Sequence, residues 1–146
     1  MQRKCPVRRR GDRRRGSLTM EMTLLFPVAM LFFLGMIEFS LLLHARQQLL
    51  AASREGARVA ALGGSIEEIR SSVRGYLGSG RLGDADVQVT TMLGDPVQDT
   101  REIGSGEPVQ VWVSIPAGYV VPDLLRFVGY SIRNEELIAR TVMRKE

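Results

Sequence analysis

Hydrophobic residues form a nearly unbroken run in the first third of the chain. Residues 22–37 carry no charge, and the wider stretch 17–43 holds two carboxylates, Glu21 and Glu38. As a helix this stretch is about 40 Å long, which is enough to cross a bilayer. An ordinary cleaved signal has a shorter apolar core of about 7–15 residues. The pattern therefore predicts a transmembrane helix over residues 17–43 that stays as an anchor.

The helical pattern continues beyond the apolar run. Residues 44–62 lack proline and are rich in alanine, glutamine and arginine, and a stripe of mostly small residues recurs at spacings of three and four. The stripe consists of Ala45, Leu49, Ala52, Gly56 and Ala60. Small residues allow another element to approach closely. We predict a helical extension that packs either on the chain's own domain or on other subunits, and that ends at Gly63-Gly64.

The remaining residues, 63–146, have the pattern of a small α+β domain with a short helix and a few antiparallel strands. Ser65 and Glu68 fit a capping box before a helix whose apolar face holds Ile66, Ile69, Val73 and Leu77. Residues 86–93 and 109–116 alternate as strands do. Residues 117–129 read as a hydrophobic loop with room for one helical turn. Residues 136–146 could form a helix or a strand, and their β-branched residues favour a closing strand.

Positive charge is concentrated before the apolar run. Residues 1–16 contain eight Arg or Lys and one Asp, a net +7, so residues 17–146 carry −3 of the formal net charge of +4. Arginine clusters can bind nucleic acid, but the rest of the chain has no second basic patch and no recognisable nucleic-acid fold. Basic residues beside a transmembrane helix stay in the cytoplasm. We therefore predict no nucleic-acid partner, a cytoplasmic N-terminus and an extracytoplasmic domain after His44.

The sequence offers no constellation for catalysis. It has no Ser-His-Asp grouping, no metal-ligand cluster and no phosphate-cradling glycine loop in a strand-turn-helix context. The single cysteine, Cys5, excludes an intrachain disulfide, and the single histidine, His44, makes a zinc site improbable. We expect a protein that is not an enzyme and needs no cofactor.

A processing site accounts for the junction between the basic arm and the apolar run. Gly16 precedes a bond that a protease could cut, which would leave Ser17 as a new N-terminus and Glu21 at mature position five. A carboxylate at mid-membrane costs about 2.5–3.5 kcal/mol, and less near the interface. A free α-amine from the same or a neighbouring subunit would offset that cost.

This arrangement resembles the type IV prepilin leader, and the chain as a whole resembles TadE-like proteins of the tight-adherence (Flp) pilus system. The resemblance rests on the leader, on "GMIEFS", on "RQQL", on "SREGAR" with Arg54, Glu55, Gly56 and Arg58, on the strand "VQVWVSIP" and on the terminal "ARTVMRKE". It implies a minor pseudopilin that acts as a structural subunit in pilus assembly. The implied partners are a prepilin peptidase, other pilins and pseudopilins, the inner-membrane assembly platform and the lipid bilayer.

Two questions stay open at this point. Glu38 lies about 26 Å beyond Glu21 along a helix, where it could contact a basic side chain of a neighbouring subunit, snorkel toward the interface or stay protonated. The alternative to a pilus subunit is an uncleaved single-pass membrane protein whose extracytoplasmic domain binds or senses a ligand. Cleavage after Gly16 distinguishes the two.

Overall fold

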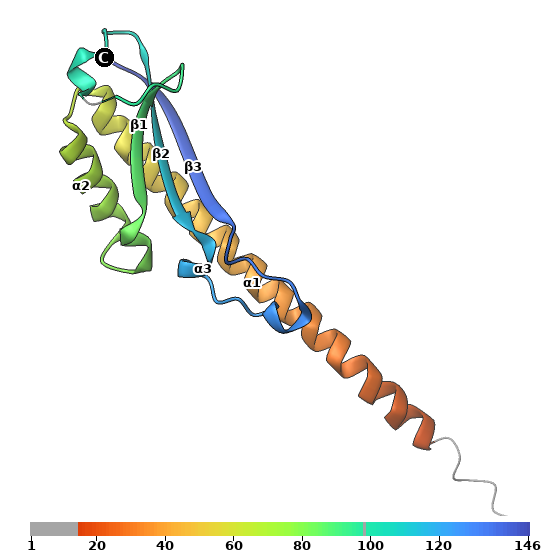
Figure 1. Cartoon of the computed structure of the whole chain (residues 1–146). Coiled ribbons are helices and arrows are strands. Elements are labelled where there is room, and N and C mark those ends of the chain that lie inside the picture. Colours follow the sequence, from red (N-terminus) through yellow and green to blue (C-terminus); the bar gives the residue numbers. More distant parts are fainter. Residues whose placement is uncertain (1–14, 98) are drawn as a thin grey trace, which may run out of the picture.

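The computed structural model of the chain describes residues 15–97 and 99–146 (Figure 1). A long helix, α1 (Arg15–Ala61), is followed by a short helix, α2 (Ile66–Leu77), and a three-stranded sheet. The strands are β1 (Asp86–Thr91), β2 (Pro108–Pro116) and β3 (Glu136–Arg144), and one helical turn, α3 (Ala117–Val120), follows β2. The predicted α+β class, with a long N-terminal helix and a small domain, is confirmed.

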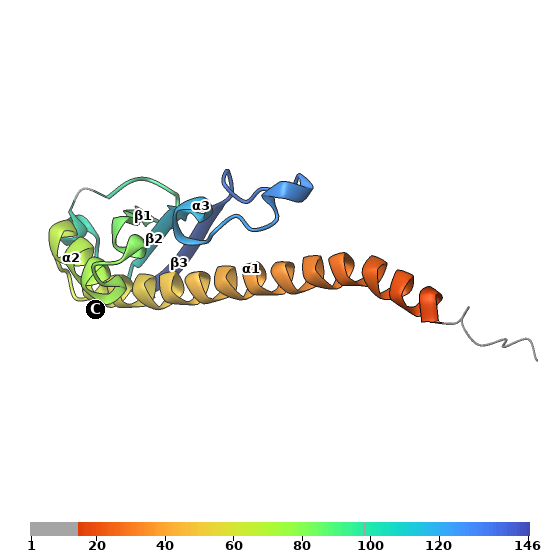
Figure 2. The ribbon, with the colours of Figure 1, turned by 90° about the horizontal axis from the view of Figure 1, so that it is seen from below.

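Helix α1 is continuous over its 47 residues, a length of about 70 Å. It runs through Pro27 without a break, although proline cannot donate the bond that would reach the carbonyl of Thr23. Its N-terminal half extends beyond the domain, and its C-terminal half lies along the sheet (Figures 1 and 2). The helix ends before Gly63, whose φ of 78° few other residues adopt readily.

The sheet is antiparallel throughout, in the order β1-β2-β3. Alternate residues of the central strand turn toward the helices and are buried: Val109, Val111, Val113 and Ile115. The strand predicted over 86–93 is two residues shorter, because the chain turns after Thr91, where the Gly94 N–H donates to the Thr91 carbonyl. The predicted closing strand is present as β3.

Helix α2 begins with the predicted capping box. The Ser65 hydroxyl accepts from the Glu68 N–H at 3.3 Å, and the Ser65 N–H donates to Glu68 Oε2 at 2.8 Å. Ile69 and Val73 on its apolar face are fully buried. Glu67 and Glu68 in the first turn also suit the positive end of the helix dipole.

The core lies between the sheet and the two helices, which cover one sheet face (Figure 2). Helix α1 contributes small residues to it, α2 contributes Ile69 and Val73, and the strands contribute mainly valines. The stretch 45–61 of α1 is therefore built into the domain.

A loop connects α3 to β3 and runs back beside α1 toward its N-terminal half (Figure 1). We call residues 122–131 the docked loop. Its base is tied where the Ala117 N–H donates to the Glu135 carbonyl at 2.8 Å. A short 3-10 turn, Arg126–Val128, lies within it.

Candidate functional site

The N-terminal half of α1 presents an apolar surface that the domain does not cover. Among the described residues, the exposed large hydrophobic side chains of this half are Met20, Met22, Leu24, Leu25, Phe26, Val28, Met30, Phe32, Phe33, Met36, Ile37, Phe39, Leu41 and Leu43. By length and composition, the helix could cross a membrane. An apolar surface of this size has no favourable contact with water, which fits the predicted anchor.

The predicted processing site lies at the start of α1. Gly16 and Ser17 fall within the helix, whereas most of the basic leader, residues 1–14, lies outside the described residues. Glu21 is exposed and lies four residues after Ser17. One helical turn separates these two positions, so they share a helix face. The backbone thus places Glu21 where a new α-amine at Ser17 would be near.

Glu38 is the buried carboxylate of α1, with 2% of its surface exposed. Its Oε2 accepts from the Leu125 backbone N–H at 3.1 Å. Its Oε1 is buried without a hydrogen-bond partner among the described residues. The carboxylate thus holds the docked loop of its own chain, a contact that no pattern along the sequence indicates. The predicted basic partner in another subunit stays a prediction.

All five members of the small-residue stripe are buried inside the domain. Gly56 is the closest crossing point: a Cβ there would lie 2.7 Å from Val73 Cγ2 and 3.3 Å from Val111 Cγ1. Glycine is therefore needed so that α1 can meet α2 and β2 together. Of the two alternatives for this stripe, the described chain uses it for its own domain.

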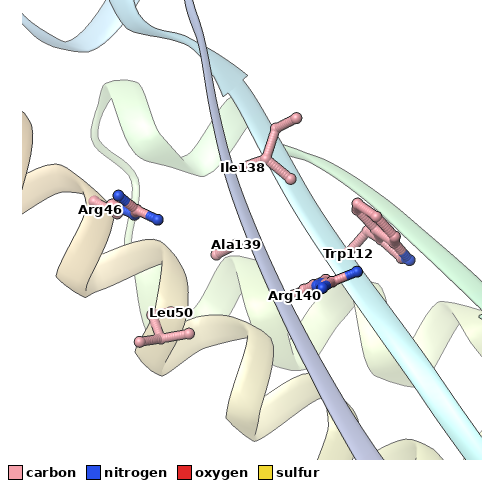
Figure 3. A pocket seen from close by; sticks show the side chains of 6 residues that line it. All are labelled: Arg46, Leu50, Trp112, Ile138, Ala139 and Arg140. Atoms are coloured by element: carbon pink, nitrogen blue, oxygen red, sulfur yellow. The ribbon is translucent and has the colours of Figure 1, made fainter.

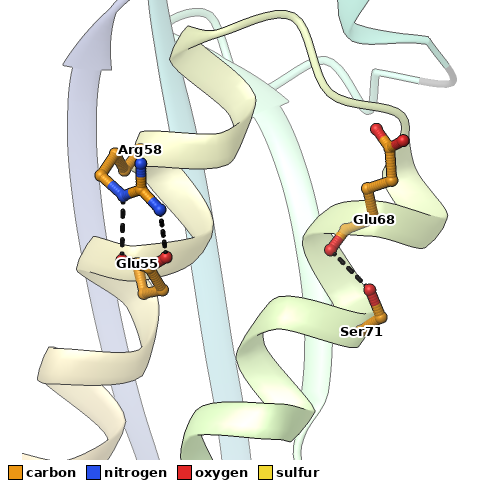
Figure 4. Close-up of polar contacts among 4 residues, drawn as sticks. All are labelled: Glu55, Arg58, Glu68 and Ser71. Carbon is orange, nitrogen blue, oxygen red and sulfur yellow. Dashed lines mark hydrogen bonds and ion pairs between the residues drawn. The ribbon is translucent and has the colours of Figure 1, made fainter.

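The residues of the "SREGAR" segment divide between core and surface. Gly56 is buried, Arg54 is exposed, and Glu55 forms a two-point ion pair with Arg58, at 2.7 and 3.1 Å (Figure 4). The hydrogen bonds from Arg58 lower the pKa of Glu55, and the same bonds raise the pKa of Arg58. The pair lies on the solvent side of α1, one turn apart. A second polar contact in Figure 4 joins Ser71 Oγ to the Glu68 carbonyl on α2 at 2.9 Å.

The preceding residue, Ser53, links α1 to the edge strand. Its Oγ lies 2.7 Å from Thr141 Oγ1 on β3 and also donates to the Leu50 carbonyl. Ser53 is fully buried. A buried hydroxyl needs such partners, and two residues 88 apart in sequence satisfy each other here. No local pattern marks Ser53, because its partner Thr141 lies far along the chain.

The terminal "VMRKE" segment acts as a clamp within the domain. Lys145 Nζ donates to the carbonyls of Thr100 and Ile103 at 2.9 and 2.5 Å. The Glu146 N–H donates to the carbonyl of Ala61, the last residue of α1. Lysine at this position thus ties the end of the chain to the connection between β1 and β2, and the next residue reaches the end of α1.

A groove of about 310 Å³ lies around β3 (Figure 3). Its lining comes from α1, β2 and β3, and consists of Arg46, Leu50, Trp112, Ile138, Ala139 and Arg140. The Arg140 guanidinium lies 5.6 Å from the centre of the Trp112 ring, a cation–π distance, and Trp112 Nε1 donates to Thr90 Oγ1. The Trp112↔Arg140 strand register creates this pair, which no local sequence pattern could reveal.

Within the described part of the chain, no cluster of three or more His, Cys, Asp or Glu could hold a metal.

These features define a class of protein: a small α+β domain built onto the end of one long helix whose free half could span a membrane. Residues 16–58 match the family model described as TadE-like protein, which confirms the predicted resemblance over the anchor and most of its extension. The matched residues lie entirely within α1. No curated protein and no solved structure matches the chain.

Proposed function

We propose that this protein is a membrane-anchored pseudopilin that serves as a structural subunit in assembly of the tight-adherence pilus. One observation carries the proposal: a single continuous helix is apolar and uncovered over one half and packs in the core of a domain over the other. Such a helix can pack beside others in a membrane while its domain projects in a fixed direction. The TadE-like match over residues 16–58 covers most of this helix and supports the assignment.

The proposed partners follow from the order of events. A prepilin peptidase would cut after Gly16, and other pilins and pseudopilins would pack beside α1 on an inner-membrane assembly platform. The role requires no catalytic group and no cofactor. The basic leader would hold the N-terminus on the cytoplasmic side, with the domain in the extracytoplasmic space.

The first test is cleavage. N-terminal sequencing of the membrane-bound protein should begin at Ser17, because a small residue before the bond suits a narrow intramembrane active site. Gly16→Arg should leave the full-length chain. Gly11→Arg, in the same basic leader, is the matched control and should be cut normally. An intact N-terminus in cells with an active prepilin peptidase would instead favour the uncleaved binding or sensing protein.

Topology is tested separately. A reporter that is active only outside the cytoplasm, fused after Glu146, should be active. The same site should give no signal with a reporter that is active only in the cytoplasm. The reverse pattern would exclude the proposed orientation and, with it, the pilus role.

Glu21 tests the assembly step. If its carboxylate pairs with the α-amine freed at Ser17, of the same or a neighbouring chain, the pair would set the axial register between helices. An unpaired carboxylate in low dielectric is costly or becomes protonated. Glu21→Gln should then be cut and inserted normally but give fewer pili. Glu67→Gln, an exposed carboxylate on α2, is the control and should leave assembly unchanged.

Two other results for Glu21→Gln would revise this role. Normal pilus numbers would exclude a register function. A block confined to cleavage would assign Glu21 to recognition by the peptidase, and the subunit role would then rest on the helix and the domain.

A further inference from the structure

The docked loop exposes an unusual set of apolar side chains for a segment outside the anchor. Phe127, Val128 and Tyr130 are 70%, 54% and 60% exposed. They are near neighbours in sequence, and two of them are aromatic. Solvent-exposed groups of this kind mark an interaction surface more often than isolated exposed residues do.

The loop is built to hold these side chains in place. The Val128 and Gly129 N–H groups donate to the carbonyls of Leu125 and Arg126, and Gly129 adopts a φ of 90°. Ser131 Oγ donates to Asp123 Oδ2 at 2.6 Å, which closes the loop across its ends. These internal bonds reduce the cost of removing its backbone from water.

The position of the docked loop along α1 determines whether the loop contacts lipid or water. Glu38 binds the Leu125 N–H, and a Cβ at Gly35 would lie 3.7 Å from Leu125 Cδ1. Both contacts fall inside the apolar stretch 17–43. From Ser17 to Glu38 a helix rises about 30 Å, which is the thickness of the hydrocarbon core. If α1 spans the bilayer, the loop therefore lies at the membrane boundary on the side of the domain.

We propose that the docked loop is a second membrane contact, which inserts Phe127, Val128 and Tyr130 into the lipid interface on the domain side. This inference rests on the proposed anchoring of α1. Aromatic rings are favoured at this depth, and Tyr130 can keep its hydroxyl among the headgroups. The exposed Arg126 can reach lipid phosphates while its stem stays in the apolar layer.

The contact also explains why Glu38 is covered. A carboxylate at this depth would otherwise face lipid, where an unpaired charge or unsatisfied oxygen is costly. The loop covers it and supplies a backbone donor to Oε2, while Oε1 stays buried without a partner among the described residues. Glu38 and the loop would thus fix the angle of the domain to the membrane, because α1 and the loop make two separate contacts with the same surface.

The test places an environment-sensitive fluorophore on single cysteines in the full-length protein. In a Cys5→Ser background, Phe127→Cys reports on the loop and Phe33→Cys on the anchor. Leu93→Cys, an exposed apolar position in the turn after β1, is the matched control at the far end of the sheet. The labelled proteins are reconstituted at low density in vesicles of zwitterionic and anionic phospholipids that carry an acyl-chain nitroxide quencher.

We expect the label at position 127 to lose on the order of half its fluorescence, as a label at the headgroup–acyl boundary should. The label at position 33 should be quenched more, and the label at position 93 should be unaffected. Quenching at 33 with none at 127 would overturn the loop contact and leave the anchor intact. No quenching at 33 would overturn the anchor and the inference together. If the label at 127 escapes quenching and the unlabelled Phe127→Cys protein forms disulfide-linked dimers in the same vesicles, the lipid contact would be overturned in favour of a protein interface.

Discussion

The two halves of α1 differ in how far the domain covers their side chains, although they form one helix. The N-terminal half carries large apolar residues that the domain leaves exposed, whereas the C-terminal half carries alanine, glycine and serine that are fully enclosed. Large side chains suit hydrocarbon, because lipid adapts its shape to them. Small side chains suit a crossing with a sheet and a second helix, because the backbones must approach closely. Exposed large apolar side chains thus mark the half that could span a membrane, and buried small side chains mark the half that packs in the domain.

Leucine gives the sharpest comparison of the two halves. Leu49 is fully buried, whereas Leu24 is 76% exposed on the same helix. Leu49→Ala should lower the free energy of unfolding of the domain by about 2–5 kcal/mol, because it leaves a cavity in the core. Leu24→Ala should leave the domain unchanged. Urea unfolding in detergent micelles, followed by Trp112 fluorescence, measures both, and equal shifts would contradict the division of the helix.

Substitution of a glycine in each half of α1 gives the same comparison, with a smaller expected change in the free energy of unfolding. Gly56→Ala should destabilise the domain by about 1 kcal/mol: overpacking costs about 1–3 kcal/mol, and the better helix propensity of alanine offsets up to about 1 kcal/mol. The stiff Val73 cannot yield easily at 2.7 Å. Gly35→Ala is the control, since its new methyl group would meet Leu125 at an ordinary 3.7 Å. If Gly56→Ala stabilised the domain in the same unfolding assay, α1 and α2 would have room for a methyl group at this position, contrary to the 2.7 Å distance to Val73.

Glu38 lies where the two halves meet, and its effect should be local. Glu38→Ala removes the acceptor for the Leu125 N–H and should destabilise loop docking by about 1 kcal/mol. Glu38→Gln keeps a carbonyl oxygen and should preserve the contact. Hydrogen exchange at the Leu125 amide should be faster in the alanine variant alone, while exchange in β2 stays slow. Unchanged exchange in the alanine variant would exclude Glu38 as the docking group.

The Glu55–Arg58 pair should have the smallest effect, because both side chains are solvent-accessible. The pKa of Glu55 is lowered in the folded state, so its contribution is present above the ordinary glutamate pKa and is lost as the pH falls through the lowered value. Glu55→Gln should therefore reduce the thermal unfolding temperature slightly at neutral pH and not at strongly acidic pH. A difference that persists in acid would mean that Glu55 acts through packing.

Sequence alone identified the elements whose signals are local. The apolar run, the capping box at Ser65 and Glu68, and the alternating valines of β2 each depend on neighbours within a few residues. Period and capping follow directly from helix and strand geometry. The β-branched residues near the end of the chain favoured a closing strand, and β3 is present there. Strand β1 ends two residues before the predicted bound. The chain turns there, because Gly94 adopts a positive φ and its N–H donates to the Thr91 carbonyl, so Met92 and Leu93 lie in the turn.

Only the tertiary structure decided which surfaces are used. The small-residue stripe suited an internal or an external partner equally well, until α2 and the sheet covered it. Glu38 looked like a residue awaiting a basic partner, yet a backbone N–H 87 positions later in the chain reaches it. The Lys145 clamp, the Ser53–Thr141 link and the Trp112–Arg140 pair likewise join distant segments. Such contacts depend on how the chain returns on itself, which the spacing of residues along α1 does not specify.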